Sequence, residues 1–178
     1  MNIFIKFFLV TFIYFICTFV IFASESSSDE ILIKATFIEK FTHFVEWPDQ
    51  NKPEEKTFVI SIIGKHPINE VIDKFFSDVK IKNRPVKIRK FTKIDAEVLQ
   101  SDIIFIAKQN KNELKELLDS TGNKPILTIS DNEDYCKEGV IINFINTDNK
   151  IGFEINKKAA QNAGLAINFL LFNIAKVI

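Results

Sequence analysis

Glycine and cysteine are scarce in this chain, and their scarcity excludes several classes of protein. The sequence has only five glycines and contains neither GxGxxG nor GxxxxGK[ST], so we expect no dinucleotide-binding or P-loop site. Cysteine occurs twice, at Cys17 and Cys136, and Cys17 lies inside an apolar N-terminal run. A chain left with one cysteine after export cannot form an internal disulfide. We interpret Cys136 as a packing residue, with a reactive thiol as the alternative.

Histidine and net charge are equally limited. His43 and His66 occur without HxH, HxxxH or CxxC, so we expect no metal site and no cofactor. The 23 basic and 23 acidic residues balance, and the lysines alternate with acids, which argues against a nucleic-acid partner. No GxSxG elbow surrounds Ser130, and no pair of carboxylates suits acid–base work. The residues therefore favour a protein that is not an enzyme.

The N-terminus carries a long uncharged run. Lys6 precedes 16 uncharged residues, from Phe7 to Phe22, and the small residues Ala23 and Ser24 follow. A membrane-spanning helix needs about 20 apolar residues, so this run is typical of a secretory signal. We predict a signal peptide over 1–23, a serine-rich linker over 24–28, one domain over 29–178, and export to the periplasm. The alternative is an uncleaved anchor that holds the domain at the inner membrane.

Apolar runs alternate with helical patterns along the rest of the chain. Three runs, Thr57–Ile63, Asp102–Ala107 and Pro125–Ser130, are typical of buried strands. Val86–Phe91 alternates instead, as a strand exposed on one face does. Helical periodicity occurs over 29–46, 68–79, 94–100, 110–120 and 157–163. This alternation predicts an α/β fold with a mostly parallel sheet of about six strands and helices on both faces.

The C-terminal segment predicts a hairpin followed by two helices. Val140–Ile145 and Lys150–Ile155 flank a turn-rich tetrapeptide, which indicates an antiparallel hairpin at the edge of the sheet. Asn156 is a suitable N-cap for the next helix, and Gly164 suits its C-terminal end. A final amphipathic helix is predicted by the spacing of Ile167, Leu170, Leu171, Ile174, Ala175 and Ile178.

Two groups of aromatic side chains are candidates for a partner-binding surface. One lies on and just after the first predicted helix, and the other lies outside the main face of the last helix. Their members are Phe37, Phe41, Phe44 and Trp47 in the first group, and Phe169 and Phe172 in the second. Exposed clusters of this kind mark interfaces. The alternative is that both helices are simply buried on two sides.

A candidate ligand crevice lies where predicted strands end. Gly64 and His66 follow the first buried strand, while Ser130 ends the third and Asp131 follows it. Ligands of α/β proteins bind at the carboxyl ends of strands, so these residues are the candidate site of a small-molecule sensor. The simpler interpretations are a turn residue for His66 and a helix cap for Asp131.

Several segments resemble one family in their order and spacing. Phe41–Pro48 is similar to an N-F-x-K-F-V-E-W-P segment, and Ile63–Pro67 to a G-x-x-P-F turn with Ile68 where Phe is usual. Asn83–Arg89 is similar to a G-R-P-V-x-V-R strand. Matches continue over 127–131 and 139–165, so the resemblance spans residues 31–178. The chain resembles the YfiR-like periplasmic domains.

The resemblance implies a secreted, non-enzymatic α/β domain that acts by binding. The best-known family members repress an inner-membrane diguanylate cyclase by binding its periplasmic region, and an outer-membrane lipoprotein sequesters them and lifts the repression. Related domains are fused to sensor kinases, and members are often homodimers. The expected function is therefore periplasmic repression of cyclic di-GMP synthesis by protein–protein interaction. A small-molecule-binding sensor module is the alternative. Family members often carry paired cysteines, which this chain lacks after export.

Overall fold

The computed structural model describes residues 28–48, 57–109, 111–147 and 150–178. The predicted signal peptide, residues 24–27 of the linker, the polar run 49–56 and part of the hairpin turn lie outside the described residues. The first helix is described from 28 to 44 and ends before the predicted Glu46, because Val45–Glu46 forms the short strand β1. Within the described ranges, no helix is long and apolar enough to span a bilayer.

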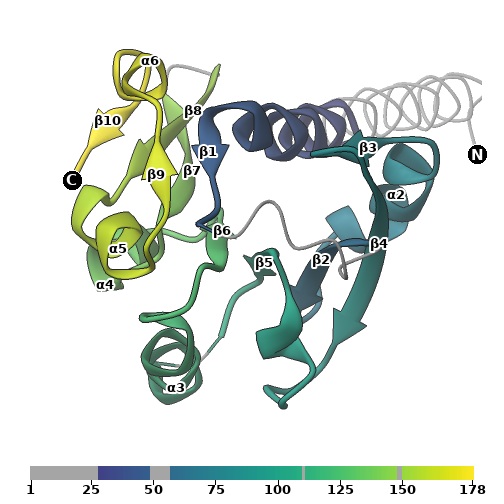
Figure 1. Cartoon of the computed structure of the whole chain (residues 1–178), viewed down its shortest axis with the longest axis horizontal. Helices are drawn as coiled ribbons and strands as arrows, with labels where there is room; N and C mark the ends of the chain where they lie inside the picture. The colour runs from purple at the N-terminus through teal and green to yellow at the C-terminus, as the bar shows by residue number, and fades with distance from the viewer. Residues whose placement is uncertain (1–27, 49–56, 110, 148–149) are drawn as a thin grey trace, which may run out of the picture.

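A mostly parallel sheet of eight strands organises the molecule, in the order β10-β8-β7-β6-β5-β2-β4-β3 (Figure 1). Strands β4, β2, β5, β6 and β7 are parallel to one another. The sheet has more strands than the predicted six or so, because the short edge strands β3 and β10 give no clear sequence signal. Its strands are β2 (Phe58–Ile63), β3 (Lys80–Ile81), β4 (Arg84–Phe91), β5 (Ile103–Ile106), β6 (Leu127–Ser130), β7 (Ile142–Thr147), β8 (Lys150–Ile155) and β10 (Lys176–Val177).

Helices cover both faces of the sheet. One core packs the first helix and α2 against the face that carries Ile60 and Phe105. The other packs α3 and η1 against Ile104 and Ile106. Alternate residues of a strand point to opposite faces, so a continuous apolar run supplies both cores. The helices are α2 (Ile68–Phe76), η1 (Val98–Gln100), α3 (Lys111–Thr121), α4 (Tyr135–Glu138), α5 (Lys157–Asn162) and α6 (Phe169–Phe172).

A tight hairpin, which the sequence did not predict, joins β3 to β4. Its two turn residues, Lys82 and Asn83, have φ angles of 51° and 63°. Positive φ at both positions is typical of the type I′ turn, whose twist matches that of the flanking strands. Asparagine tolerates this conformation, but Lys-Asn is a weaker hairpin signal than Asn-Gly.

The chain after α5 departs most from the prediction. The predicted final helix over Ile167–Ile178 is wrong, because this segment forms β9 (Ala166–Ile167), the four-residue helix α6 and the strand β10. β9 pairs with β1, and β10 pairs in parallel with β8. The antiparallel β7–β8 hairpin is present, but β10 lies beyond it at the edge of the sheet. Pairing with distant segments outweighs a helical periodicity that buries only Leu171 in α6.

Candidate functional site

The carboxyl ends of β2 and β6 bring two residues of the predicted ligand crevice into contact. His66 Nε2 lies 2.9 Å from Asp131 Oδ2. Lys34, which comes from the first helix, donates to the same oxygen at 2.6 Å and also pairs with Glu30 at 2.8 Å. The side chains of Lys34, His66 and Asp131 are only 9%, 13% and 11% exposed. His66 and Asp131 therefore meet, and the Lys34 ammonium lies beside them.

Hydrogen bonding determines the proton position on His66. The backbone N–H of Ile68 donates to His66 Nδ1 at 3.1 Å, so Nδ1 carries no proton in the neutral ring. The proton is then on Nε2, which donates to Asp131. The ring also packs on Phe105 with centroids 4.9 Å apart. Both ring nitrogens are occupied, which makes His66 a structural residue in this conformation.

The other two crevice residues are also engaged by the protein itself. Ser130 is fully buried, and its Oγ donates to the carbonyl of Ile106 at 2.7 Å. Asn132 Nδ2 donates back to that Oγ at 3.0 Å. Gly64 has a φ of +92°, and a Cβ there would lie 2.5 Å from Gln109 Nε2. Glycine is needed at this position for backbone conformation and space.

The charges of this cluster shift two pKa values. Burial by itself raises the pKa of Asp131, but hydrogen bonds and charge from His66 and Lys34 outweigh it and lower the pKa from 3.8 to about 2. Burial likewise lowers the pKa of Lys34, yet its bonds to Asp131 and Glu30 outweigh burial and raise the pKa above 10.5. The pair is therefore charged at neutral pH and joins the first helix to the sheet.

The first aromatic group contributes mainly to the core. Phe41 has no exposed surface and Trp47 is 8% exposed, whereas Phe37 and Phe44 are half-buried. The rings of Phe41 and Phe153 are 4.9 Å apart, which ties the first helix to the β7–β8 hairpin. Helical spacing does not separate the buried residues of this group from the half-buried ones, because Phe37 and Phe44 pack against the same core as Phe41 and Trp47 but are only partly covered.

The C-terminal segment carries the most exposed apolar side chains of the described ranges. Phe172 is half-buried, with the Lys157 ammonium 5.9 Å from its ring centre. Five other exposed apolar side chains belong to α6, to β10 and its last neighbour, and to the loop between the two elements, and we call these five the C-terminal apolar surface. Figure 1 shows where α6 and β10 lie. The five are Phe169 (68% exposed), Leu170 (49%), Ile174 (69%), Val177 (50%) and Ile178 (40%). Such a concentration of exposed apolar area is typical of an interaction site.

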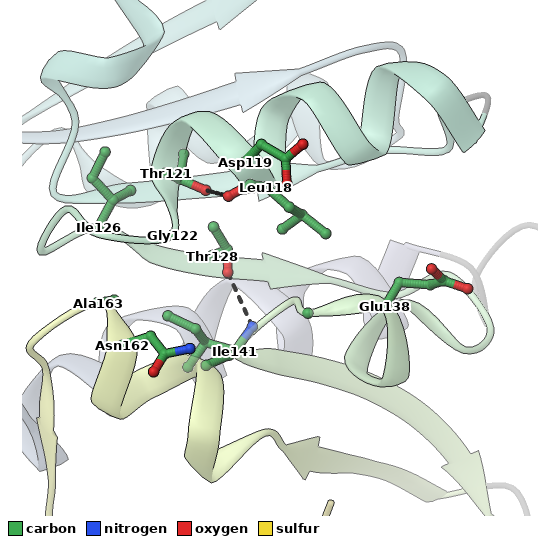
Figure 2. Close-up of a pocket in the computed structure, with 12 residues that line it drawn as sticks. Leu118, Asp119, Thr121, Gly122, Ile126, Thr128, Glu138, Ile141, Asn162 and Ala163 are labelled. Carbon is green, nitrogen blue, oxygen red and sulfur yellow. Dashed lines mark hydrogen bonds between the residues drawn. The ribbon is translucent and has the colours of Figure 1, made fainter.

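Two hollows are not lined by any of the four residues of the predicted crevice, although the second lies beside Gly64. The first has a volume of about 210 Å³ and lies between α3, the end of α4 and α5, as Figure 2 shows. The second, of about 230 Å³, lies where β2 and β4 end beside α3, and Gln109, Lys93 and Glu116 line it. The sequence gives no signal for either hollow, because each is formed by segments far apart in the chain.

Metal and thiol chemistry have little support in the described ranges. No group of three His, Cys, Asp or Glu side chains in them is arranged to hold a metal ion. Cys136 is a free cysteine with no exposed surface. Burial, followed by the nearby charge of Glu154, raises the pKa of its thiol to about 12. A buried thiol of this kind is unreactive at neutral pH.

Comparison with known proteins identifies the family. No curated protein matches the chain. A family model described as YfiR/HmsC-like matches residues 32–176, which is most of the chain and nearly all of its described part. The match includes the first helix, the sheet, and the C-terminal segment up to β10. On the extent of this match, the chain belongs to the YfiR/HmsC-like family.

Proposed function

We propose that the chain is a periplasmic regulatory domain that represses an inner-membrane diguanylate cyclase by binding its periplasmic region. The observation that carries the proposal is the C-terminal apolar surface, on a chain that belongs to the YfiR/HmsC-like family. Phe169 and Ile174 are each about two-thirds exposed, at 68% and 69%, and burying them against a partner is favourable. Repression follows if the domain binds the inactive conformation of the cyclase better than the active one.

In this proposal the chain is exported across the inner membrane before it binds the cyclase. Residues 1–23 act as the signal peptide and residues 29–178 form the domain that meets the partner outside the cytoplasm. The intact mass of the protein recovered from the cell envelope tests this assignment. A chain that begins at Ser24 supports cleavage, whereas a mass that includes residues 1–23 supports the anchored alternative.

Competition for the same surface accounts for release. An outer-membrane lipoprotein that covers Phe169 and its neighbours would displace the cyclase and restore synthesis of cyclic di-GMP. A second copy of the chain is another candidate occupant, which sedimentation of the purified protein detects. The small-molecule sensor alternative gains no support at the predicted crevice, because Lys34 occupies the space beside His66 and Asp131.

The decisive test is the intracellular level of cyclic di-GMP in the native host. Deletion of the gene should raise the level, and the wild-type gene should restore it while a version without residues 1–23 should not. The double variant Phe169→Asp, Ile174→Asp should also fail to restore it, because two charges on the surface weaken binding at least about tenfold. Both residues are exposed, so the variant should be exported and folded like the wild type.

A matched control places the same charges on another apolar region. Leu32 and Ile33 of the first helix are 49% and 45% exposed, so Leu32→Asp, Ile33→Asp adds the same two charges at apolar positions that are also exposed. This control should restore repression. Loss of repression in the control alone would indicate that the binding site lies on the first helix. An unchanged level after deletion would reject the repressor function itself.

A further inference from the structure

The β3–β4 hairpin concentrates positive charge in a chain whose charges otherwise balance. Residues 80–93 contain five lysines and two arginines but no aspartate or glutamate, although acidic and basic residues are equal in number over the whole chain. The hairpin lies at one edge of the sheet, at the opposite end from β10 (Figure 1). Basic residues gathered on one element attract polyanions to that part of a protein surface.

Strand register places three of these basic side chains on one face of the sheet. Lys80 of β3 lies opposite Pro85 of β4, so the two side chains share a face. Alternation along β4 adds Lys87 and Arg89 to that face, and we call Lys80, Lys87 and Arg89 the basic row. Lys80 and Lys87 are exposed, and Arg89 is half-buried. The charges therefore lie along one outward face of the sheet edge.

The opposite face of the hairpin uses its charges within the protein. Arg84 Nη2 donates to the Asp102 carboxylate at 2.7 Å, and Lys90 pairs with Asp73. By contrast, no acidic side chain in the described ranges forms an ion pair with a member of the basic row. The positive charge of the row is consequently free to meet an external anion.

Arg89 gives independent evidence that the basic row lacks a counter-ion. Its Nη1 has essentially no accessible surface, yet no described residue accepts a hydrogen bond from it. A buried donor without an acceptor is destabilising, and a charged donor more so. An anion at this face would offer the Arg89 guanidinium the acceptor that the protein does not supply.

We infer that the basic row docks on the anionic surface of a phospholipid bilayer. The strand β4 runs for about 26 Å, and neither of the two hollows is lined by the row. Charges spread along an open strand suit an extended anionic plane, whereas a single phosphate needs donors that converge on one point. Lys82 in the hairpin turn and Lys93 just beyond β4 extend the same charge at both ends.

Docking on a bilayer is independent of repression of a cyclase. The basic row and the C-terminal apolar surface share no residue and lie at opposite ends of the strand order. Loss of charge from the row should therefore weaken binding to vesicles and leave the C-terminal apolar surface intact. An acidic protein surface is the competing occupant, and the experiment separates it from a bilayer.

Vesicle sedimentation with the protein recovered from the cell envelope tests the inference. The protein should bind vesicles that contain about one third phosphatidylglycerol at least about tenfold more tightly than vesicles of phosphatidylcholine alone. Added salt should weaken binding to the anionic vesicles. Any contribution from residues 1–23 is common to the wild type and all variants. Equal binding to the two kinds of vesicle would overturn the inference.

Two double variants assign the binding to the basic row. Lys80→Gln, Lys87→Gln should weaken binding to the anionic vesicles at least about tenfold, because each basic residue near an anionic bilayer contributes about fivefold. The control Lys40→Gln, Lys158→Gln removes the same charge from exposed positions on the first helix and α5, whose apolar residues pack in the core on the other face of the sheet. This control should bind like the wild type, and an equal loss in both variants would contradict a role of the row.

Poly-L-glutamate distinguishes a bilayer from an acidic protein partner. At a carboxylate concentration equal to that of the lipid phosphate, it should leave most of the wild-type protein on the anionic vesicles, because a flexible chain does not present charge as a fixed plane. Release of the protein by poly-L-glutamate would overturn docking on a bilayer and indicate an acidic polypeptide as the occupant of the basic row.

Discussion

Cys136 illustrates what burial does at the scale of one residue. Its Sγ lies 4.0 Å from the carbonyl oxygen of Ile141, between α4 and β7. The sequence leaves a packing residue and a reactive thiol both open, because it does not reveal burial. Zero exposure and a pKa of about 12 support the packing interpretation.

Cys136 should react with a disulfide exchange reagent at least about a hundredfold more slowly in the native protein than in urea, because little thiolate forms at pH 8. The measurement is thiol release in a Cys17→Ser background, so that Cys136 alone is followed. Cys136→Ser in the same background should show no reaction. Equal rates in native and unfolded protein would contradict the burial of this thiol.

The sequence predicted part of the cluster around Asp131 but not all of it. Parallel strands of one sheet end at the same edge, so the sequence could place His66 and Asp131 at that edge, although β5 lies between β2 and β6. The sequence could not place Lys34 beside Asp131, because a lysine on a helix is ordinarily expected to point into solvent. Lys34 and Asp131 are separated by 97 positions. One feature of the sequence did point to a buried Lys34: it lies next to Ala35 and Ile38 on the apolar side of the first helix.

At the scale of elements, Asp102 joins β2, β4 and Trp47, which directly follows β1. Its carboxylate accepts from the backbone N–H of Val59 on β2 and from Arg84 on β4, both at 2.7 Å. Its carbonyl oxygen accepts from Trp47 Nε1 at 3.3 Å. The Arg84 guanidinium lies 4.9 Å from the centre of the Phe58 ring. Two segments of the family resemblance, around Trp47 and around Arg84, thus meet at one aspartate.

Asp102→Ala should lower the free energy of unfolding by about 2 to 4 kcal/mol, because it leaves Arg84 and the Val59 N–H without this acceptor. Urea unfolding followed by the fluorescence of Trp47, the only tryptophan of the chain, measures the loss. Asp73→Ala, which removes an exposed ion pair with Lys90, should cost less than about 1 kcal/mol. Similar losses in both variants would argue against the joining role of Asp102.

For the whole molecule, the Lys34–Asp131–His66 cluster fastens the first helix to the carboxyl edge of the sheet. The folded pKa of Asp131 lies below the value of an unperturbed carboxyl, so its ionised form stabilises the folded state. That stabilisation is complete above the unfolded pKa of 3.8 and is lost as pH falls toward about 2. Acid should therefore weaken the attachment of the helix.

Asp131→Asn should destabilise the protein at pH 7 by about 1 to 2 kcal/mol, after allowance for solvent screening. The difference from the wild type should shrink as the pH falls from about 4 to about 2, because the wild-type carboxylate becomes protonated there. Urea unfolding across this range measures the difference. A destabilisation that stays constant with pH would show that the charge of Asp131 does not contribute.

The sequence by itself determined the fold class and the positions of the central strands. Phe58–Ile63 and Ile103–Ile106 are apolar at every position or nearly so, and a parallel strand buried on both faces requires this composition. The requirement is local, so one run of residues is enough to recognise it. The antiparallel hairpin was also predictable from a local signal, the turn-rich tetrapeptide between its strands. The strand β7 begins later than expected, at Ile142.

Only the tertiary structure decided the C-terminal segment and the surfaces. Residues 166–178 have a helical spacing of apolar residues, yet β9 and β10 pair with β1 and β8. Those pairings depend on strands distant in the chain, and the exposure of Phe169 and the burial of Phe41 follow from which segments cover them. A periodic pattern shows which side chains share a face, whereas the partner of that face is set by packing that no local stretch encodes.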